Sequence, residues 1–420
     1  MTEAPGGQFA IALGNTALLA PASDDGKLAG TEIDDFGFDL LRKLASTGNL
    51  CASPTSIALA LAMVRSGARG ITGTEMDEVL HGFGSPGQAR EVVALLKELQ
   101  AQTVYQDDGA SGDSQATPDH TGQQPVVELD VSNAVFAQEG MSLEQAYLDS
   151  LSSEFGAGLG LLDYQNDPEG ARKIINAWAS DQTKGRIPEV LHPGDVTSGT
   201  RIALANAIYL NAGWSDPFDP QFTKSLPFTR PNGSAVSVPT MAIEREFAYT
   251  AGTGYRAVEL PYGNGLGSLS MTIVVPANMS TFVSGLSAAT LASIDARAKT
   301  YQVDLTLPRF SADTRTDLAT ALGAMGMSAL FDPDAADLSG ITTDQQLYIT
   351  EAIHEANIDV VEQGTTASAV TVALGGATAG PVSFPHVQFH VNQPFLYFIR
   401  EQTTGAVLFM GRIDDPSVKS

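Results

Sequence analysis

The chain has one cysteine, few basic residues and no long hydrophobic run. A lone Cys51 among 420 residues excludes an internal disulfide, and its apolar setting, Leu50-Cys51-Ala52, predicts a small buried side chain. No apolar run approaches the roughly 18 residues that a membrane-spanning helix needs. With 23 Lys and Arg against 48 Asp and Glu, the net charge is −25. This balance argues against a nucleic-acid partner, which would require a basic surface.

The first residues, Met1 to Pro5, lack the basic start that is typical of a secretory signal. We expect an extracellular protein whose signal has been removed, with the cytoplasm as the alternative. No membrane partner is expected.

Common catalytic motifs are also missing. The chain has no Gly-x-Ser-x-Gly motif and no glycine-rich phosphate loop ending in Gly-Lys-Ser/Thr. His354-Glu355 lacks the second histidine that a zinc-protease motif places four residues after the first. His386 and His390 lie in a strand-like pattern, about 13 Å apart, which is too far to share a metal ion. The sequence therefore predicts no enzyme, no metal site and no cofactor.

Helical patterns dominate the first half of the chain. Apolar residues from Phe36 to Ala45 recur on one helical face. Ser53-Pro54 is a strong helix start, and the residues from Ile57 to Val64 are apolar nearly all round, which predicts a buried helix. Thr74 is expected to cap a further helix that runs to Leu80. Residues 171–180 are also predicted to be helical.

Strand patterns dominate the second half. A change from early helices to late strands favours an α+β fold with large mixed sheets. Residues 1–30 are weakly patterned and are interpreted as an N-terminal tail with a short element, and residues 31–420 as one domain. Residues 106–125, rich in Asp, Gly, Ser, Gln and Pro, interrupt this domain as a polar loop insertion. The predicted strands are 126–136, 202–210, 270–275, 303–307, 348–361, 395–399 and 406–410.

The most unusual segment lies between Glu362 and Arg400, where no residue is charged. Residues 365–374 consist of Thr, Ala, Ser, Val and Leu, which suit a strand better than a flexible linker. Every second residue is small, so one face of this strand would be uniformly small. Such an edge strand is usually protected by charge against unwanted pairing. Because residues 365–374 carry no such charge, we infer that this segment is meant to insert between other strands. The small face comprises Thr365, Ala367, Ala369, Thr371 and Ala373.

Several motifs resemble the serpin family of serine protease inhibitors. The run Glu362-Gln363-Gly364-Thr365, with Thr371 seven residues after Gly364, resembles the hinge of inhibitory serpins. The residues from Phe389 to Ile399 resemble the signature that follows the reactive-centre loop, and those from Gly405 to Arg412 resemble the last strand. Upstream segments are similar to the family as well, so that the resemblance covers about residues 30 to 416. These segments are Asn49 to Ser56, Asn206 to Phe218 and Leu338 to Gly340.

The resemblance implies one domain with three β-sheets, about nine helices and an exposed reactive-centre loop, here 362–386. In inhibitory members a target protease acylates itself on the loop, which then inserts into the main sheet and traps the enzyme. Small inward-facing hinge residues favour an inhibitor, because overpacking a site typically costs ~1–3 kcal/mol. A non-inhibitory carrier or storage serpin stays as the alternative.

The resemblance also implies roles for individual residues. A small polar cluster should lie where the main sheet opens, Trp214 should lie at the top of that sheet, and Arg309 should pair with Glu362. As a surface pair, this contact would contribute only ~0–1 kcal/mol. The hinge itself would comprise Glu362, Gly364, Thr365, Ala367, Ala369 and Thr371, and the sheet-opening cluster Ser53, Ser56, Asn206 and His354.

The family's spacing from Gly364 places the reactive bond at Thr378-Ala379, whereas counting back from Pro394 gives Ser383-Phe384. We prefer the first, since the inserted strand must have a set length. Small residues there suit elastase-like or subtilisin-like serine proteases, with Phe384 and Leu374 as possible secondary sites for chymotrypsin-like enzymes. We expect a monomer whose partner is the target protease.

Overall fold

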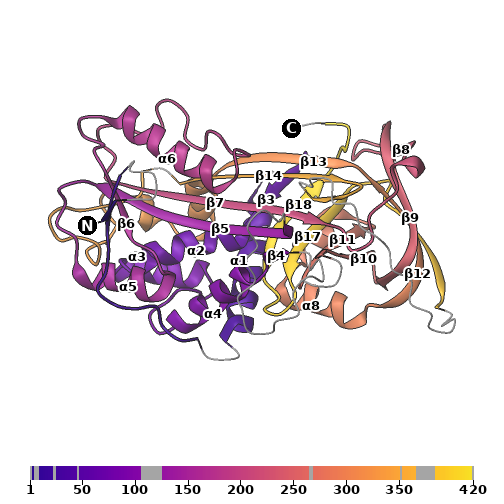
Figure 1. Cartoon of the computed structure of the whole chain (residues 1–420), viewed down its shortest axis with the longest axis horizontal. Helices are drawn as coiled ribbons and strands as arrows, with labels where there is room; N and C mark the ends of the chain where they lie inside the picture. The colour runs from indigo at the N-terminus through magenta and orange to yellow at the C-terminus, as the bar shows by residue number, and fades with distance from the viewer. Residues whose placement is uncertain are drawn as a thin grey trace, which may run out of the picture.

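A computed structural model describes residues 2–3, 9–21, 25–44, 47–105, 125–263, 268–350, 352–365 and 384–418. Within these residues nine α-helices and two hydrogen-bonded sheets form an α+β fold (Figure 1). The helices are α1 (Asp25–Lys43), α2 (Pro54–Arg65), α3 (Gly70–Val79), α4 (Ala89–Gln100), α5 (Gln145–Phe155), α6 (Pro168–Gln182), α7 (Met279–Ser284), α8 (Ala288–Arg297) and α9 (Leu318–Met325).

The first sheet, called the main sheet below, contains long strands that run side by side across the molecule (Figure 1). Its order is β1 (Thr2–Glu3), β2 (Ala10–Ala12), β6 (Leu159–Leu162), β5 (Pro125–Gln138), β7 (Ile202–Gly213), β15 (Gly364–Thr365), β14 (Ile353–Val361) and β13 (Phe310–Asp317), with β4 (Val104–Tyr105) on β5.

The described residues form two hydrogen-bonded sheets where the family resemblance implies three, because the long strand β9 (Ala235–Gly252) connects the two parts of the second sheet. Residues 240–249 of β9 pair with β12 (Lys299–Pro308), and residues 248–252 pair with β10 (Tyr255–Pro261). One part of the sheet also includes β8 (Lys224–Thr229) and β16 (His386–His390). The other part continues from β10 through β11 (Leu269–Pro276), β17 (Phe395–Glu401), β18 (Val407–Ile413) and β3 (Leu50–Ala52).

Helix α2 occupies the core between the two sheets. All twelve of its residues are buried, and it packs against β5 and β7 on one side and β18 on the other. The predicted start is confirmed, since the Ser53 Oγ accepts a hydrogen bond from the Ser56 N–H and Pro54 begins the helix. Each large apolar side chain buried here stabilises the fold by ~1.5–3 kcal/mol. Cys51, beside this helix, is fully buried as predicted, and burial raises the pKa of its thiol to about 12.

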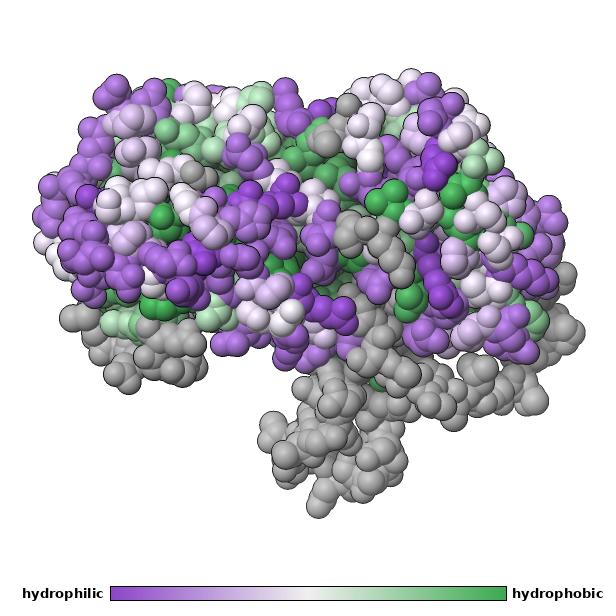
Figure 2. Space-filling model, turned by 90° about the horizontal axis from the view of Figure 1, so that it is seen from above, coloured by the Kyte–Doolittle hydropathy of each residue, from purple (hydrophilic) through white to green (hydrophobic). Residues whose placement is uncertain are grey.

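Helix α6 and the segment that follows it lie on the outer face of the main sheet, opposite the helices of the core (Figure 1). In the view from above, polar residues cover most of this face and hydrophobic residues show only in small patches (Figure 2). No helix in the described part of the chain is long and apolar enough to cross a bilayer.

Two expectations on boundaries are corrected. Helix α1 begins at Asp25, inside the stretch predicted as tail, and β2 adds residues 10–12 of that stretch to the main sheet. Thr74 does not cap a helix, because α3 begins at Gly70 and the Thr74 hydroxyl donates to the Gly70 carbonyl oxygen within it. Of the predicted insertion at residues 106–125, residues 106–124 lie outside the described residues, and Pro125 begins β5.

Candidate functional site: the hinge and the opening of the main sheet

The hinge begins where β14 ends. The chain turns at Glu362 and Gln363, and then Gly364 and Thr365 form the short strand β15 between β14 and β7. Gly364 has a φ of +152°, and a Cβ at this position would overlap the carbonyl oxygen of Ala212, so only glycine fits. The first two residues of an additional strand are therefore already in place in the main sheet.

The Glu362 carboxylate fixes this turn. Its Oε1 accepts hydrogen bonds from the Arg309 Nε and Nη2 at 2.9 and 2.7 Å, and a further one from the Thr223 hydroxyl. Burial alone would raise the pKa of Glu362, but these bonds outweigh it and hold the pKa below its usual range. The predicted pair with Arg309 is present, although Glu362 is buried rather than on the surface, with 2% of its side chain exposed.

Trp214 lies at the end of β7, directly beside the hinge. Its indole Nε1 donates to the Val361 carbonyl oxygen at 3.0 Å, and its backbone N–H donates to the Gln363 carbonyl oxygen at 2.9 Å. Its ring stacks on Tyr262 with centroids 4.4 Å apart, and the Tyr262 hydroxyl is hydrogen-bonded to the Thr365 Oγ1. Thr365 is consequently buried, and its side chain points into the sheet's inner face.

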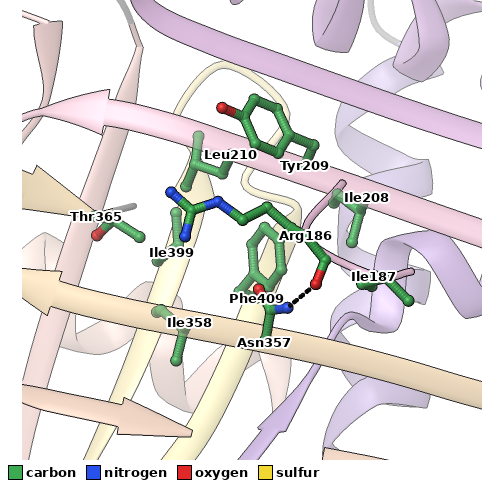
Figure 3. Close-up of a pocket in the computed structure, with 10 residues that line it drawn as sticks. All are labelled: Arg186, Ile187, Ile208, Tyr209, Leu210, Asn357, Ile358, Thr365, Ile399 and Phe409. Atoms are coloured by element: carbon green, nitrogen blue, oxygen red, sulfur yellow. Dashed lines mark hydrogen bonds between the residues drawn. The ribbon is translucent and has the colours of Figure 1, made fainter. Parts of the chain in front are cut away.

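A small cavity of about 10 Å³ follows directly after Thr365, between β7 and β14. Ile208 and Leu210 of β7 line it on one side and Ile358 of β14 on the other (Figure 3). The side chain of Arg186, from the segment after α6, extends along the gap between these two strands toward Thr365 (Figure 3). The space into which the next residues of β15 would extend is thus nearly closed.

Farther along the same two strands, His354 connects three elements. Its Nε2 accepts the Ser53 N–H at 3.0 Å, and its Nδ1 is 3.0 Å from the Asn206 Oδ1. Burial lowers the pKa of His354 to about 4, so the ring is neutral at pH 7. Because Nε2 is an acceptor, the single proton resides on Nδ1 and is donated to Asn206.

The structure thus brings Ser53, Asn206 and His354 together. Ser56 lies in the first turn of α2, and its Oγ is buried without a hydrogen-bond partner among the described residues. Asn133 on β5 was not predicted, but it lies opposite Asn206 in the strand register and also has a buried, unpartnered Oδ1. Unsatisfied buried groups are costly, so this cluster is a weak point of the closed sheet.

Comparison with known proteins identifies this arrangement. The family model described as "Serpin (serine protease inhibitor)" matches residues 31–416. The chain belongs to the serpin family. The family's description and the names of the similar proteins are those of protease inhibitors and not of enzymes. Within the described residues, no group of three or more His, Cys, Asp and Glu could hold a metal ion.

Several individual serpins are similar over almost their whole length. A leukocyte elastase inhibitor of Xenopus tropicalis is 33% identical over 393 residues, which is 91% of this chain and 97% of that protein. The human leukocyte elastase inhibitor is 32% identical with the same coverage, and human Serpin B13 is 30% identical. A crystal structure of native protease nexin-1 with heparin is similar in fold, with a TM-score of 0.76 and 26% identity over 93% of this chain and 100% of that one.

Two parts of the predicted site lie outside the described residues of this serpin. One is the reactive bond Thr378-Ala379, and the other is the hinge beyond Thr365, with Ala367, Ala369 and Thr371. Tyr262 and Thr223, which hold Thr365 and Glu362, were not predicted. They are 103 and 139 residues away from these partners in sequence, so no local pattern could indicate the contacts.

Proposed function

We propose that this serpin is a single-use inhibitor of serine proteases that traps its target by inserting its reactive-centre loop. The observation that carries the proposal is the strand β15, which starts between β7 and β14 and is followed directly by a small-residue segment. Thr365 faces the inner side of the sheet, and alternation would place Ala367, Ala369 and Thr371 on that same side. Small side chains there allow the strand to continue inward without overpacking.

The proposed mechanism has two chemical steps: the protease forms an acyl-enzyme with the serpin loop, and hydrolysis of that acyl-enzyme is then prevented. The protease serine attacks the carbonyl carbon of Thr378, the peptide bond to Ala379 breaks, and the new amine of Ala379 leaves with the released proton. The serpin is then joined through an ester to the protease. Residues 366–378 extend β15 and carry the ester along, and distortion of the protease active site prevents water from completing hydrolysis.

The sheet topology favours this insertion. Strand β15 is antiparallel to both β7 and β14, so those two strands run parallel to each other. An inserted strand would convert this part of the sheet into an antiparallel array that continues the β5–β7 and β14–β13 pairs. Antiparallel pairing is slightly more stable per residue than parallel pairing.

Target preference is proposed from the bait residues and from the relatives. Ala377, Thr378 and Ala379 are small and suit proteases with shallow primary pockets. The similar proteins from Xenopus and human are named leukocyte elastase inhibitors. We therefore assign elastase-like serine proteases as the first target class, with subtilisin-like enzymes second, and one serpin monomer for each protease.

Mixing equimolar serpin and pancreatic elastase, followed by denaturing electrophoresis and mass spectrometry, tests the proposal. We expect a covalent band near the summed masses and a released peptide that begins at Ala379. The variant Thr365→Arg should be cleaved without forming the band, because an arginine does not fit the buried position beside Tyr262 that Thr365 occupies and would displace β15, from which the inserted strand extends. Thr253→Arg, in an exposed turn between β9 and β10, is the matched control and should still form it.

Suppose that elastase, subtilisin and chymotrypsin all cleave the wild type without forming a covalent band. That result would contradict the proposed inhibitory function and favour the alternative, a non-inhibitory serpin. A band accompanied by a peptide that starts at another residue would keep the mechanism and move the reactive bond.

A further inference from the structure

The residues before α1 form an arm that adds a strand to the main sheet. Within this arm, which comprises residues 9–21, β2 pairs antiparallel with β6, with Ala10 opposite Leu161 and Ala12 opposite Leu159. The arm then runs past the second half of α5 (Figure 1). It precedes the residues that match the family model, which begin at residue 31. The loop-insertion mechanism described above does not use it.

Apolar side chains of the arm pack closely on the sheet. The Phe9 ring meets the Phe136 ring of β5 edge to face, with their centroids 5.2 Å apart. A Cβ on Gly158 would lie 2.5 Å from the Ile11 Cγ2, and a Cβ on Gly160 would lie 3.1 Å from the Phe9 ring. These two glycines therefore allow the arm to approach the sheet closely, which indicates a specific contact.

Hydrogen bonds hold the arm on α5. The Asn15 N–H donates to the Asp149 Oδ1 at 2.7 Å, and the Thr16 hydroxyl donates to the Asp149 carbonyl oxygen at 2.7 Å. Farther along, the Leu19 N–H donates to the Ser153 carbonyl oxygen at 2.8 Å. The arm is thus bound to the helix over several of its residues as well as to the sheet.

Gly14 makes the closest approach of the arm to α5. Its N–H donates to the Ser152 Oγ at 2.9 Å. A Cβ on Gly14 would lie 2.3 Å from the Leu148 carbonyl oxygen and 2.7 Å from the Asp149 Cα. Because these are backbone atoms of a helix, they cannot move aside as a flexible side chain would. Any side chain at position 14 should therefore lift the arm away from α5.

The arm spans the short turn between α5 and β6. Two of the three residues in this turn, Gly156 and Gly158, are glycines, and Gly156 has a φ of +62°. Such a turn by itself gives the helix and the strand freedom to move relative to each other. The arm is bound to β6 on one side of the turn and to α5 on the other, so it restrains that movement.

The start of α5 is tied to the other side of the place where the main sheet would open. The Ser142 N–H donates to the Asp344 Oδ2 at 2.9 Å, and the Glu144 N–H donates to the Ile341 carbonyl oxygen at 2.9 Å. Residues 341–344 lead toward β14, whereas β6 is joined through β5 to β7. The arm and α5 therefore connect two parts that must separate when a strand enters between β7 and β14.

We propose that the edge of β6 and the second half of α5 form a docking surface for an extended peptide, that residues 9–19 of this chain occupy it, and that docking holds the main sheet closed. The contacts are those of strand addition, in which backbone pairing supplies affinity and side-chain contacts supply specificity. Docking itself does not depend on protease inhibition. Only its consequence, slower loop insertion, rests on the function proposed above.

Removing the arm and supplying it as a separate peptide tests the docking surface. A fluorescent peptide of residues 9–21 is titrated into a chain that lacks residues 1–21, and binding is followed by fluorescence anisotropy. We expect one peptide to bind per chain, and the peptide with Gly14→Ala to bind about tenfold more weakly. The full-length chain, whose surface is occupied, should bind much less. Equal binding of the two peptides, or no binding to the shortened chain, would overturn the docking surface.

Hydrogen exchange followed by mass spectrometry tests the restraint. In the full-length chain, Gly14→Ala should make the amides of β7 exchange about tenfold faster than in the wild type. The control Gly323→Ala makes the same change in α9, where a Cβ would meet no atom within 4 Å, and it should exchange as the wild type does. Wild-type exchange in Gly14→Ala would show that the arm does not hold the sheet closed.

These experiments separate the two proposals. Neither measurement uses a protease, so a chain that inhibits none would still show peptide docking and faster exchange if the arm acts as proposed. Gly14→Ala retains the whole chain, and it decides the outcome should the shortened chain fail to fold.

Discussion

His354 is a fully buried histidine whose two ring nitrogens both have partners in the closed sheet. Its Nε2 receives the N–H of Ser53 on one side, and its Nδ1 donates to Asn206 on β7 on the other. A proton on Nε2 would break the first bond and place a charge in a dry environment, which is why the folded protein favours the neutral ring.

This environment predicts a pH-dependent stability. The pKa of His354 is lowered from 6.5 to about 4. Between these values the unfolded chain binds a proton that the folded chain does not, so stability should fall as pH decreases from 6.5 to 4 and should not depend on His354 above 6.5. The full loss is about 3 kcal/mol. Urea unfolding midpoints measured across this range for the wild type and His354→Gln give the difference.

The variant should show a shallower decline than the wild type between pH 6.5 and 4. The matched control His192→Gln replaces an exposed histidine and should retain the wild-type slope. Parallel curves for wild type and His354→Gln would show that the buried ring does not set this dependence.

The residues of the site differ in how well the sequence predicted them. Glu362, Gly364 and Trp214 lie in motifs that resemble the family, and the structure places all three at the hinge. Asn133, Tyr262 and Thr223 have no such local signal. Their importance arises only in the folded chain. Strand register places Asn133 opposite Asn206, and tertiary packing brings Tyr262 to Thr365 and Thr223 to Glu362.

At the scale of elements, the segment after α6 spans the place where the main sheet must open. Lys184 forms ion pairs with Glu128 and Asp130 on β5, at 3.3 and 3.6 Å. Two residues later, the Arg186 carbonyl oxygen accepts a hydrogen bond from the Asn357 Nδ2 on β14 at 3.2 Å. This segment therefore links strands on both sides of the gap that a new strand would occupy (Figure 3).

Asn357→Ala should make insertion faster, because β14 could then move away from β7 without breaking this bond. A hydrogen bond contributes ~0.5–1.5 kcal/mol, which corresponds to a roughly twofold to tenfold change in rate. The measurement is the rate at which inhibitory activity is lost on incubation at moderately raised temperature, through spontaneous insertion of the intact loop. Asn232→Ala, in the exposed β8–β9 turn, is the control and should leave the rate unchanged. An unchanged or slower rate in Asn357→Ala would show that the bond does not restrain the sheet.

The elements themselves were largely predictable where their periodicity is strong. The buried helix from Pro54 and the strands at residues 202–213 and 395–401 lie close to their expected positions. The predicted start of α3 was wrong. Threonine is a residue type that often caps helices, but the Thr74 hydroxyl donates to the Gly70 carbonyl oxygen inside the helix. The continuity of β9 from one part of the second sheet into the other depends on long-range pairing, which a local pattern cannot show.

For the whole molecule, the proposed mechanism requires that the described structure is not the most stable arrangement of the chain. Among the described residues, β7 and β14 have two residues of β15 between them. A buried polar cluster, with oxygens that have no hydrogen-bond partner in the same part of the chain, lies farther along these strands. Cutting the loop would free residues 366–378 to complete the sheet. The cleaved chain should therefore be more stable than the intact one, although it has lost a peptide bond.

Thermal unfolding before and after the loop is cut tests this consequence. Unfolding entropy scales as ~2.1 cal/mol/K per residue, so a gain of ~10 kcal/mol would raise the Tm of a chain of this size by ~10 °C. We expect a rise of at least about that size after limited elastase treatment, measured by circular dichroism. Thr365→Arg, cut in the same way, should show little or no rise, because the arginine displaces β15 and the new strand then has no start in the sheet. A wild-type Tm that stays constant or falls after cleavage would mean that the strand does not insert, and the trapping mechanism would fail with it.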